Sequence, residues 1–220
     1  MITLRIEVPY ASFRKSFARS FAETYPLAPP ATVYGMLLSL VGEYFRATHT
    51  GVRLAFAYKK LPHIATTLRK LSRYKYGVPT KQATLGNAPD FIETLCELDF
   101  LCWIDSSEEN TRLTVAETLE LRLQNALNSP ENVSRHGVLY LGLSDDAVNS
   151  VNICNRFEGD WHRLLPDDAG PIELPVWVDH VGAANTRWQR FQFDESPSPL
   201  NDVPGSANWR WIQMINPRGH

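Results

Sequence analysis

The sequence lacks several features that would place it in a familiar class of protein. Its 220 residues include three cysteines, an odd number with no C-x-x-C pair, so neither a disulfide framework nor a zinc site of common spacing is indicated. No run approaches the roughly 20 apolar residues of a membrane span, and the opening MITLRIEVPY lacks the layout of a signal peptide. We therefore predict a cytoplasmic protein with no membrane contact and with free, buried thiols.

Motifs for the common catalytic chemistries are missing as well. The six histidines show no H-E-x-x-H spacing, and no P-loop, G-x-S-x-G or dinucleotide fingerprint is present. Asp145–Asp146 and Asp167–Asp168 could bind a hard cation, but adjacent acids in turns more often face solvent or cap helices. The sequence therefore predicts no metal and no cofactor.

Charge is unevenly distributed, although the formal net charge is only -2. No acidic residue occurs between Glu43 and Asp90, whereas that stretch contains nine Lys and Arg, and no lysine follows Lys81. Such a stretch favours a polyanionic partner on one side of the molecule. The alternative is a solvated surface whose charges are balanced in three dimensions by the acidic second half.

Three prolines, Pro26, Pro29 and Pro30, precede an apolar run with helical spacing. Proline fixes its own φ and disfavours helix in the residue before it, but it is well tolerated in the first helical turn, so a helix should begin at Pro30. That helix carries a stripe of small residues, Gly35, Ser39 and Gly42. Each glycine lowers the stability of a helix by about 1 kcal/mol relative to alanine. Because this loss must be offset, the glycines indicate close approach of either another backbone or a ligand.

The remaining pattern predicts an α+β protein in the split βαββαβ order of ferredoxin-like domains. A strand at residues 2–10 alternates with a period of two, and a capping box at Thr114 and Glu117 starts a second helix. Between Ser72 and Pro89 no period is sustained, which is typical of a long functional excursion. The other expected elements are strands at 52–60, 61–71, 94–104 and 137–142, a helix at 115–128, and an irregular segment at 155–220.

The basic stretch also carries residues suited to RNA. His63, Tyr74, Lys75 and Tyr76 are close in sequence, and they could either cleave RNA by acid–base catalysis or bind it by stacking and charge. We favour binding, because it demands less exact alignment than cleavage. The tryptophans outside this stretch are expected in the core or at protein interfaces.

Two separated stretches resemble a known family. FRKSFARSFAETYPLAPPATVYGMLLSLVGE and ALNSPENVSRHGVLYLGLSDDAVN are similar to the two signatures of the CRISPR-associated RAMP subunit that holds the 5′ handle of the crRNA in type I Cascade complexes. The variant looks closest to the myxobacterial subtype and is similar to subunits of transposon-associated complexes. The resemblance implies a RAMP fold in which the long excursion, at about 72–90, forms a thumb. We therefore expect a RAMP domain over residues 1–154 and, from the strand-like stretches ELPVWVDHV and TRWQRFQF, a strand-containing C-terminal extension over 155–220 packed on the same domain.

The family's role, carried over to this chain, is a non-enzymatic subunit that caps the 5′ handle for RNA-guided DNA targeting. Its partners would be the crRNA, the large subunit, the backbone RAMP subunits and, through the complex, target DNA. The alternative is a metal-independent endoribonuclease that processes precursor crRNA. We expect the glycines to serve packing of the first helix on the sheet, and the acids of the L-G-x-S turn to leave RNA contact to its backbone N–H groups or Ser144. The residues implied in RNA binding are Arg14, Lys15, Arg19, Arg69, Arg73, Tyr74, Lys75, Lys81, Arg135, His136, Gly142 and Ser144.

Overall fold

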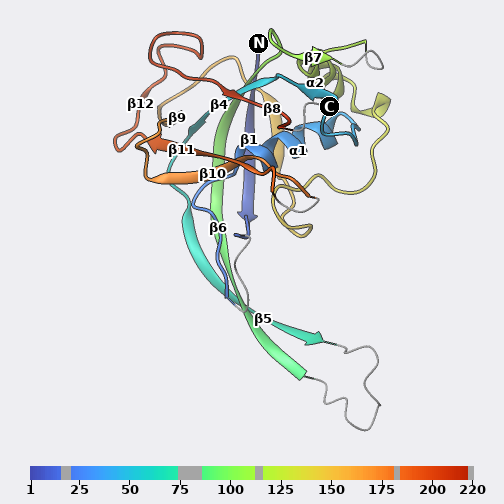
Figure 1. Cartoon of the computed structure of the whole chain (residues 1–220), viewed down its shortest axis with the longest axis vertical. Helices are drawn as coiled ribbons and strands as arrows, with labels where there is room; N and C mark the ends of the chain where they lie inside the picture. Colours follow the sequence, from blue (N-terminus) through green and yellow to red (C-terminus); the bar gives the residue numbers. More distant parts are fainter. Residues whose placement is uncertain (16–20, 74–85, 112–115, 181–183, 218–220) are drawn as a thin grey trace.

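The computed structural model describes residues 1–15, 21–73, 86–111, 116–180 and 184–217. It is an α+β protein with two α-helices and a large, mostly antiparallel sheet (Figure 1). The helices are α1 (Pro30–Leu40) and α2 (Leu119–Asn128), and a short 3-10 helix, η1, spans Pro130–Asn132. The strands are β1 (Ile2–Ala11), β2 (Phe21–Ala22), β3 (His49–Thr50), β4 (Arg53–Tyr58), β5 (His63–Arg73), β6 (Gly86–Asp105), β7 (Asn110–Thr111), β8 (Ser150–Ile153), β9 (Asp160–Pro166), β10 (Ile172–Trp177), β11 (Arg187–Phe193), β12 (Ser198–Pro199) and β13 (Ile212–Gln213).

The main path of the sheet runs β10-β11-β9-β4-β6-β1-β8, and every neighbouring pair along it is antiparallel. Two crossovers each skip one strand: β1 continues through α1 to β4, and β6 continues through α2 to β8. The predicted α+β class is therefore confirmed. The segment after residue 154 adds strands to the same sheet, because β9 pairs with β4 from Phe56–Leu164 to Tyr58–His162.

Apolar side chains cover both faces of the central strands. In β1, Ile2, Leu4, Ile6 and Val8 are buried, as the alternation predicts, and they belong to the main core beneath the helices. A second, smaller cluster on other strand positions includes Trp103 and contains residues of the C-terminal segment. Its buried members are Ala55, Ala57, Leu101, Trp103, Trp161 and Trp209. The central strands are thus protected from water on both sides, which favours a rigid platform.

Two sequence-based elements were placed wrongly. The short apolar segment between Gly137 and Gly142 is not a strand; its only ladder contact among the described residues is an isolated bridge between Tyr140 and Ala147. The strand that pairs with β1 is β8 instead. Helix α2 is capped by Thr118, whose hydroxyl accepts from the N–H of Leu121 at 3.3 Å, rather than by a box starting at Thr114, which lies outside the described residues.

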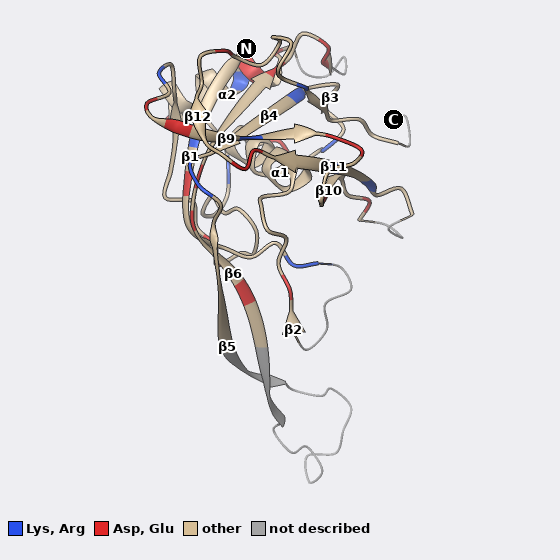
Figure 2. Cartoon of the chain, turned by 90° about the vertical axis from the view of Figure 1, so that its left-hand side faces the viewer, with Lys and Arg blue, Asp and Glu red and all other residues tan. Residues whose placement is uncertain are grey.

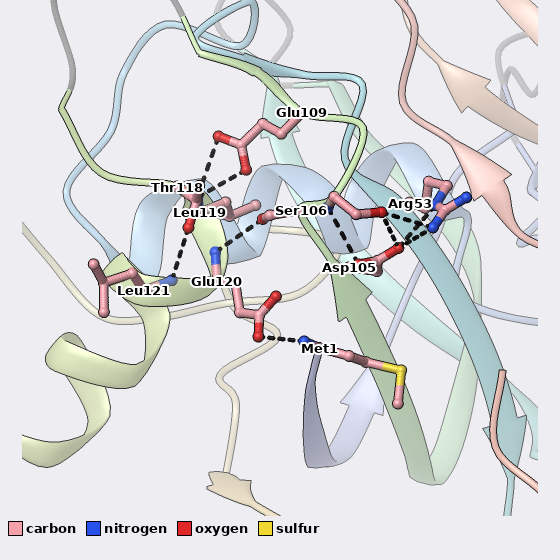
Figure 3. A network of polar contacts seen from close by, with 10 residues as sticks. Met1, Arg53, Asp105, Ser106, Glu109, Thr118, Leu119, Glu120 and Leu121 are labelled. Atoms are coloured by element: carbon pink, nitrogen blue, oxygen red, sulfur yellow. Dashed lines mark hydrogen bonds and ion pairs between the residues drawn. The ribbon is translucent and has the colours of Figure 1, made fainter. Parts of the chain in front are cut away.

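The N-terminus of α2 is held by side chains from the end of the β6 region (Figure 3). The carboxylate of Glu109 accepts from the N–H of Leu119 at 3.0 Å, and the hydroxyl of Ser106 accepts from the N–H of Glu120 at 3.2 Å. The terminal ammonium of Met1 pairs with the carboxylate of Glu120. These contacts satisfy N–H groups that a helix start leaves without partners, so α2 is fixed relative to the sheet.

Strands β5 and β6 form a long hairpin that extends away from the body (Figure 1), and it includes residues 72–73 and 86–89 of the predicted excursion. Residues 74–85 lie outside the described residues. Strands β5 and β6 pair in register from His63–Cys96 to Arg73–Gly86, so both strands continue into a region expected to lack regular structure. The strand predicted at 61–71 corresponds to β5, of which residues 63–68 are all exposed. A strand with no buried face needs no apolar period.

Two simpler expectations can be compared with the structure. All three cysteines are free, but only Cys102 is buried, where burial raises the pKa of its thiol; Cys96 and Cys154 are half-buried. Among the described residues, neither helix has the length and apolar character that spanning a membrane requires.

Candidate nucleic-acid interface

A groove runs along the surface of α1. It consists of two adjoining cavities of about 530 and 500 Å³ that share Thr32, Gly142 and Val178. Such volumes are typical of sites for small ligands or parts of larger ones, about 300–1,000 Å³. Two acids, Glu43 and Asp179, belong to the lining, and the other polar or aromatic residues are basic, aromatic or small and come from four separate segments of the chain. They are Arg14, Tyr25, Thr32, Gly35, Ser39, Tyr44, Arg46, Arg135, His136, Tyr140, Gly142, His180 and Trp188.

Helix α1 faces this groove with its least buried residues. Every residue of the helix is buried except Thr32, Gly35 and Ser39, and all three line the larger cavity. A Cβ atom at Gly35 would meet no neighbouring heavy atom within 4 Å. The prediction that Gly35 packs against the sheet is therefore wrong. The small residues lower the floor of a groove, while the sheet is contacted by the larger apolar residues on the remainder of the helix.

Gly42, in contrast, is closely packed, but not against the sheet. Its φ is +70°, and a Cβ there would lie 2.4 Å from the carbonyl oxygen of Ser134. The segment 133–138 therefore crosses directly over the end of α1; we call it the strap. The strap carries Arg135 and His136, two of the residues implied in RNA binding, and both line the larger cavity. Only glycine combines this φ with so close an approach.

Arg46 lies in the wall of the larger cavity without a carboxylate partner among the described residues. Its guanidinium donates to the carbonyl oxygen of Val178 at 3.1 Å and to Nε2 of His180 at 2.7 Å, and it lies 5.1 Å from the ring of Trp177. Its Nε is buried and has no hydrogen-bond partner. Burial lowers the pKa of Arg46, but a guanidinium stays protonated in proteins, so the groove contains an uncompensated positive charge.

The contact with Arg46 also determines the tautomer of His180. A guanidinium has only donors, so Nε2 of His180 must accept and the ring proton lies on Nδ1. The Nδ1–H of His180 is therefore a hydrogen-bond donor at the edge of the groove. Nearby, Arg135 on the strap donates to the carbonyl oxygen of Gly137 at 2.8 Å and has no carboxylate partner among the described residues.

The other end of the groove is formed by the loop that follows β1. Arg14 is exposed there and shares the smaller cavity with Tyr25 and Trp188, whose ring centroids are 6.1 Å apart. The loop is closed on itself, since the N–H of Tyr25 donates to the carbonyl oxygen of Phe13 at 3.0 Å. The structure thus brings Arg14 into the same groove as Arg135, although the two residues are far apart in the sequence.

The L-G-x-S turn is attached to the end of β1 by an acid. Oδ2 of Asp146 accepts from the N–H groups of Ser12 and Leu143, each at 2.7 Å, and a Cβ on Gly142 would lie 2.7 Å from the same oxygen. From the sequence we expected Asp146 only to be a poor neighbour for RNA phosphates. In the structure Asp146 is also buried, and its carboxylate accepts the hydrogen bond of the Leu143 N–H, so this N–H already has a partner. Ser144 is exposed beside Asp145.

Other residues implied in RNA binding are placed only in part. Lys15 forms an ion pair with Glu23 at 3.0 Å. Arg69 and Arg73 lie on β5, far from the α1 groove along the hairpin, and their side chains are not described. Arg19, Tyr74, Lys75 and Lys81 lie outside the described residues.

The residues considered for RNA cleavage are separated by β5. His63 and Arg73 are the two ends of this strand, which at about 3.3 Å per residue are roughly 30 Å apart. Tyr74 and Tyr76 lie outside the described residues. The pairing of His63 with either tyrosine therefore stays a prediction.

Some basic residues of the acid-free stretch form ion pairs with acidic residues that follow this stretch in the sequence. Arg53 pairs with Asp105, and Lys60 pairs with Glu97, so the balanced-surface alternative holds for these residues. Positive and negative residues are interspersed over the body (Figure 2). Within the described ranges, no acid forms an ion pair with Arg46, whose guanidinium instead contacts Val178 and His180. Within the part of the chain that the structure describes, no cluster of three or more His, Cys, Asp or Glu could hold a metal.

The groove residues that the sequence interpretation missed are chiefly Tyr44, Arg46, Tyr140 and His180. Arg46 belonged to the acid-free stretch and Tyr140 to the second signature, but neither signal distinguished a residue of the groove from its neighbours. His180 lies in the C-terminal segment, for which no local pattern predicted a site.

Comparison with known proteins identifies the family to which the chain belongs. The chain is 38% identical over 197 residues to the CRISPR-associated protein Cas5 of Myxococcus xanthus (strain DK1622), covering 89% of this chain and 91% of the relative. The chain belongs to the Cas5 family. The family predicted from the two sequence stretches is thereby confirmed. No protein-family model matches the chain.

Solved structures support the fold of this Cas5-family chain. A chain titled "CRISPR RNA-guided surveillance complex" superimposes with a TM-score of 0.55 at 12% identity, covering 94% of each chain. A second, "Crystal structure of Cas protein", gives a TM-score of 0.50 at 14% identity and covers 90% of this chain and 94% of the other. At these identities the likeness concerns the fold alone.

Proposed function

We propose that this Cas5-family protein is a crRNA-binding structural subunit of a type I Cascade complex, and that it holds the 5′ handle of the guide RNA for RNA-guided DNA targeting. The observation that carries the proposal is the α1 groove, where Arg14, Arg46 and Arg135 line two cavities together with exposed tyrosines. Single-stranded RNA is bound by this combination, since arginines meet phosphates and aromatic rings stack on unpaired bases.

The long hairpin supplies a second basic region in the proposal. Arg69 and Arg73 lie on β5, and Lys75 and Lys81 follow before β6 begins. We propose that these residues contact the RNA where the handle meets the spacer, while the body contacts the large subunit and the backbone RAMP subunits. The hairpin's extension from the body would let it reach RNA that the groove does not cover.

The proposal is tested by replacing Arg46 and Arg135 together by alanine. We expect the affinity of the full chain for a synthetic handle RNA to fall about 100-fold at moderate salt, because two phosphate contacts of charge-assisted type are lost. The slope of log affinity against log salt should become shallower by about 1.4, since each phosphate contact on single strands contributes about 0.7. Filter binding across a salt series measures both quantities.

Lys60→Ala is the matched control, because Lys60 is a basic residue outside the groove that already pairs with Glu97. Its affinity and salt slope should equal those of the unmodified protein. Equal losses in the control and in the double variant would contradict a specific role for the groove. Incubation with repeat RNA in EDTA tests the nuclease alternative: a product with one defined 5′ end would show that the protein is an enzyme.

A further inference from the structure

Strand β6 contains a residue whose backbone departs from strand geometry. Among the residues that the structure describes, Glu97 alone combines a side chain with a positive φ, of +58°. A Cβ atom disfavours this left-handed region, and glutamate lacks both the freedom of glycine and the short polar side chain of asparagine. Such residues persist where the surrounding structure holds them, and they cluster at functional positions. The fold therefore imposes an unfavourable backbone conformation at Glu97.

The ladders on both sides of β6 are interrupted at Glu97. Toward β1, the paired residues of β6 stop at Leu98 and resume at Cys96, and the residue opposite the gap is Pro9, which has no N–H to donate. On the other side, the pairs with β4 end at Phe100 and those with β5 begin at Cys96. Glu97 thus lies at the boundary between the part of β6 in the body and the part in the hairpin (Figure 1).

The faces of two strands change over at this boundary. Leu95 and Leu98 of β6 both belong to the main core, and so do Val8 and Ala11 of β1. Side chains alternate along a strand, so residues three apart do not share a face when the strand is regular. The pairs Val8–Leu98 and Ala11–Leu95 keep one register, because both strands make the change. The ribbon as a whole therefore turns over next to Glu97.

This change decides which face of the hairpin continues the helix side of the sheet. Residues directly opposite each other in an antiparallel ladder point to the same face, so Ile64 shares a face with Leu95, and Leu68 with Phe91. Leu95 is buried in the main core, whereas Ile64, Leu68 and Phe91 are exposed further along the hairpin. With a regular strand at Glu97, this face would continue the opposite side of the sheet.

We propose that Glu97 is a positioning residue of the hairpin. Its left-handed backbone sets the direction in which β5 and residues 86–96 of β6 leave the body, and the face that they present. The carboxylate is exposed and pairs with Lys60 at the surface, where an ion pair contributes little. A cavity of about 400 Å³, lined by Pro9 and Asp99 among others, lies beside Glu97. Close packing therefore does not fix the hairpin on that side, which leaves its direction to the backbone.

The test measures the direction of the hairpin in the full-length protein without RNA. Keto amino acids in place of Thr66 on the hairpin and Gln124 on α2, both exposed, carry two spin labels and leave the three cysteines unmodified. Glu97→Val disfavours the left-handed region strongly, because valine is β-branched. We expect the mean distance between the labels to move outside the width of the unmodified distribution.

Two further variants separate the backbone of Glu97 from its carboxylate. Glu97→Gly accepts the positive φ without strain, and Glu97→Gln removes the charge alone. Both should keep the unmodified distance, and Glu97→Gly should also unfold at a higher urea concentration. If Glu97→Val does not fold, Glu97→Gly decides the question: a lower urea midpoint or a shifted distance overturns the proposal. A shift in Glu97→Gln overturns it as well, because the carboxylate would then set the direction.

The consequence for RNA rests on the proposed function, in which the hairpin contacts RNA beyond the handle. Each variant is titrated with handle RNA alone and with handle RNA joined to a spacer segment. Glu97→Val should bind the handle as the unmodified protein does, and the longer RNA about tenfold more weakly, the usual effect of losing one stacking contact. An equal loss with both RNAs indicates general damage to the fold and contradicts a positioning role.

Failure of this proposal is distinguishable from failure of the proposed function. If Glu97→Val leaves the label distance unchanged, the positioning role is overturned, whether or not the protein binds RNA. If the unmodified protein binds neither RNA, the proposed function is overturned, while the distances measured without RNA still decide the role of Glu97.

Discussion

Replacement of Gly42 by alanine should destabilise the protein by about 2–4 kcal/mol and weaken its binding of handle RNA. A non-glycine residue at a left-handed φ costs roughly 1–2 kcal/mol, and the new Cβ would lie 2.4 Å from a backbone oxygen of the strap, at Ser134. A backbone atom cannot turn aside as a side chain can, so the strap must shift. Because the strap carries Arg135 and His136, the loss should extend to the RNA groove.

Gly35→Ala is the natural comparison for Gly42→Ala, since both changes add one methyl group to a glycine at α1 or just beyond its end. At Gly35 the methyl group meets no neighbour, and alanine is preferred over glycine inside a helix by about 1 kcal/mol. We therefore expect this variant to be more stable by about 0.5–1 kcal/mol. Urea unfolding of both variants measures the difference, and equal effects of the two substitutions would contradict the placement of the strap over Gly42.

Replacement of Arg122 by alanine should destabilise the protein by about 3–5 kcal/mol, the usual effect of removing one partner from a buried ionic network. The guanidinium contacts the carboxylate of Glu43 at 2.9 Å, Nε2 of His49 at 2.7 Å and the carbonyl oxygen of Val41 at 3.1 Å. Since a guanidinium only donates, His49 accepts at Nε2, and its Nδ1–H donates to Glu109. The network therefore joins the end of α1 to the start of α2.

Without Arg122, the side chains of His49 and Glu109, both fully buried, would remain next to an uncompensated Glu43. Arg156→Ala removes the same charge from an exposed position and should change stability by less than about 0.5 kcal/mol. The free energy of unfolding from urea titrations distinguishes the two variants. If Arg122→Ala were as mild as the control, the network would contribute little to holding the two helices together.

Local sequence patterns correctly predicted the elements with one buried face or with a clear starting residue. The alternation of β1 holds because one face of the strand lies on the main core, and α1 begins at Pro30 as the prolines require. The strand predicted at 61–71 corresponds to β5, whereas the excursion predicted between Ser72 and Pro89 was too long, because β5 and β6 stay paired up to Arg73 and Gly86. The segment at 137–142 was mistaken for a strand because its apolar residues resemble one locally, whereas the pairing partner of β1 is chosen by tertiary contact.

The residues of the candidate site likewise fall into two groups, those that the sequence identifies and those that only the folded structure identifies. Residues such as Arg14, Arg135 and His136 could be selected from the sequence because they belong to the two stretches that resemble the family. Arg46 and Tyr44 could not, because an arginine without an acidic partner and an exposed ring at a cavity are properties of the folded chain. The same holds for Gly35. Glycine lowers helix stability relative to alanine by the same amount whether another backbone or a ligand approaches it, so the sequence does not distinguish the two cases.

The sequence by itself determined the family, the α+β class and the helix that starts after three prolines, because these depend on residue order and on short-range backbone preferences. Only the tertiary structure decided which small residues of α1 face a groove and which lie beneath the strap, and which basic residues keep a free positive charge. The physical reason is that packing and charge pairing are made between segments distant in the sequence, so no local pattern contains them.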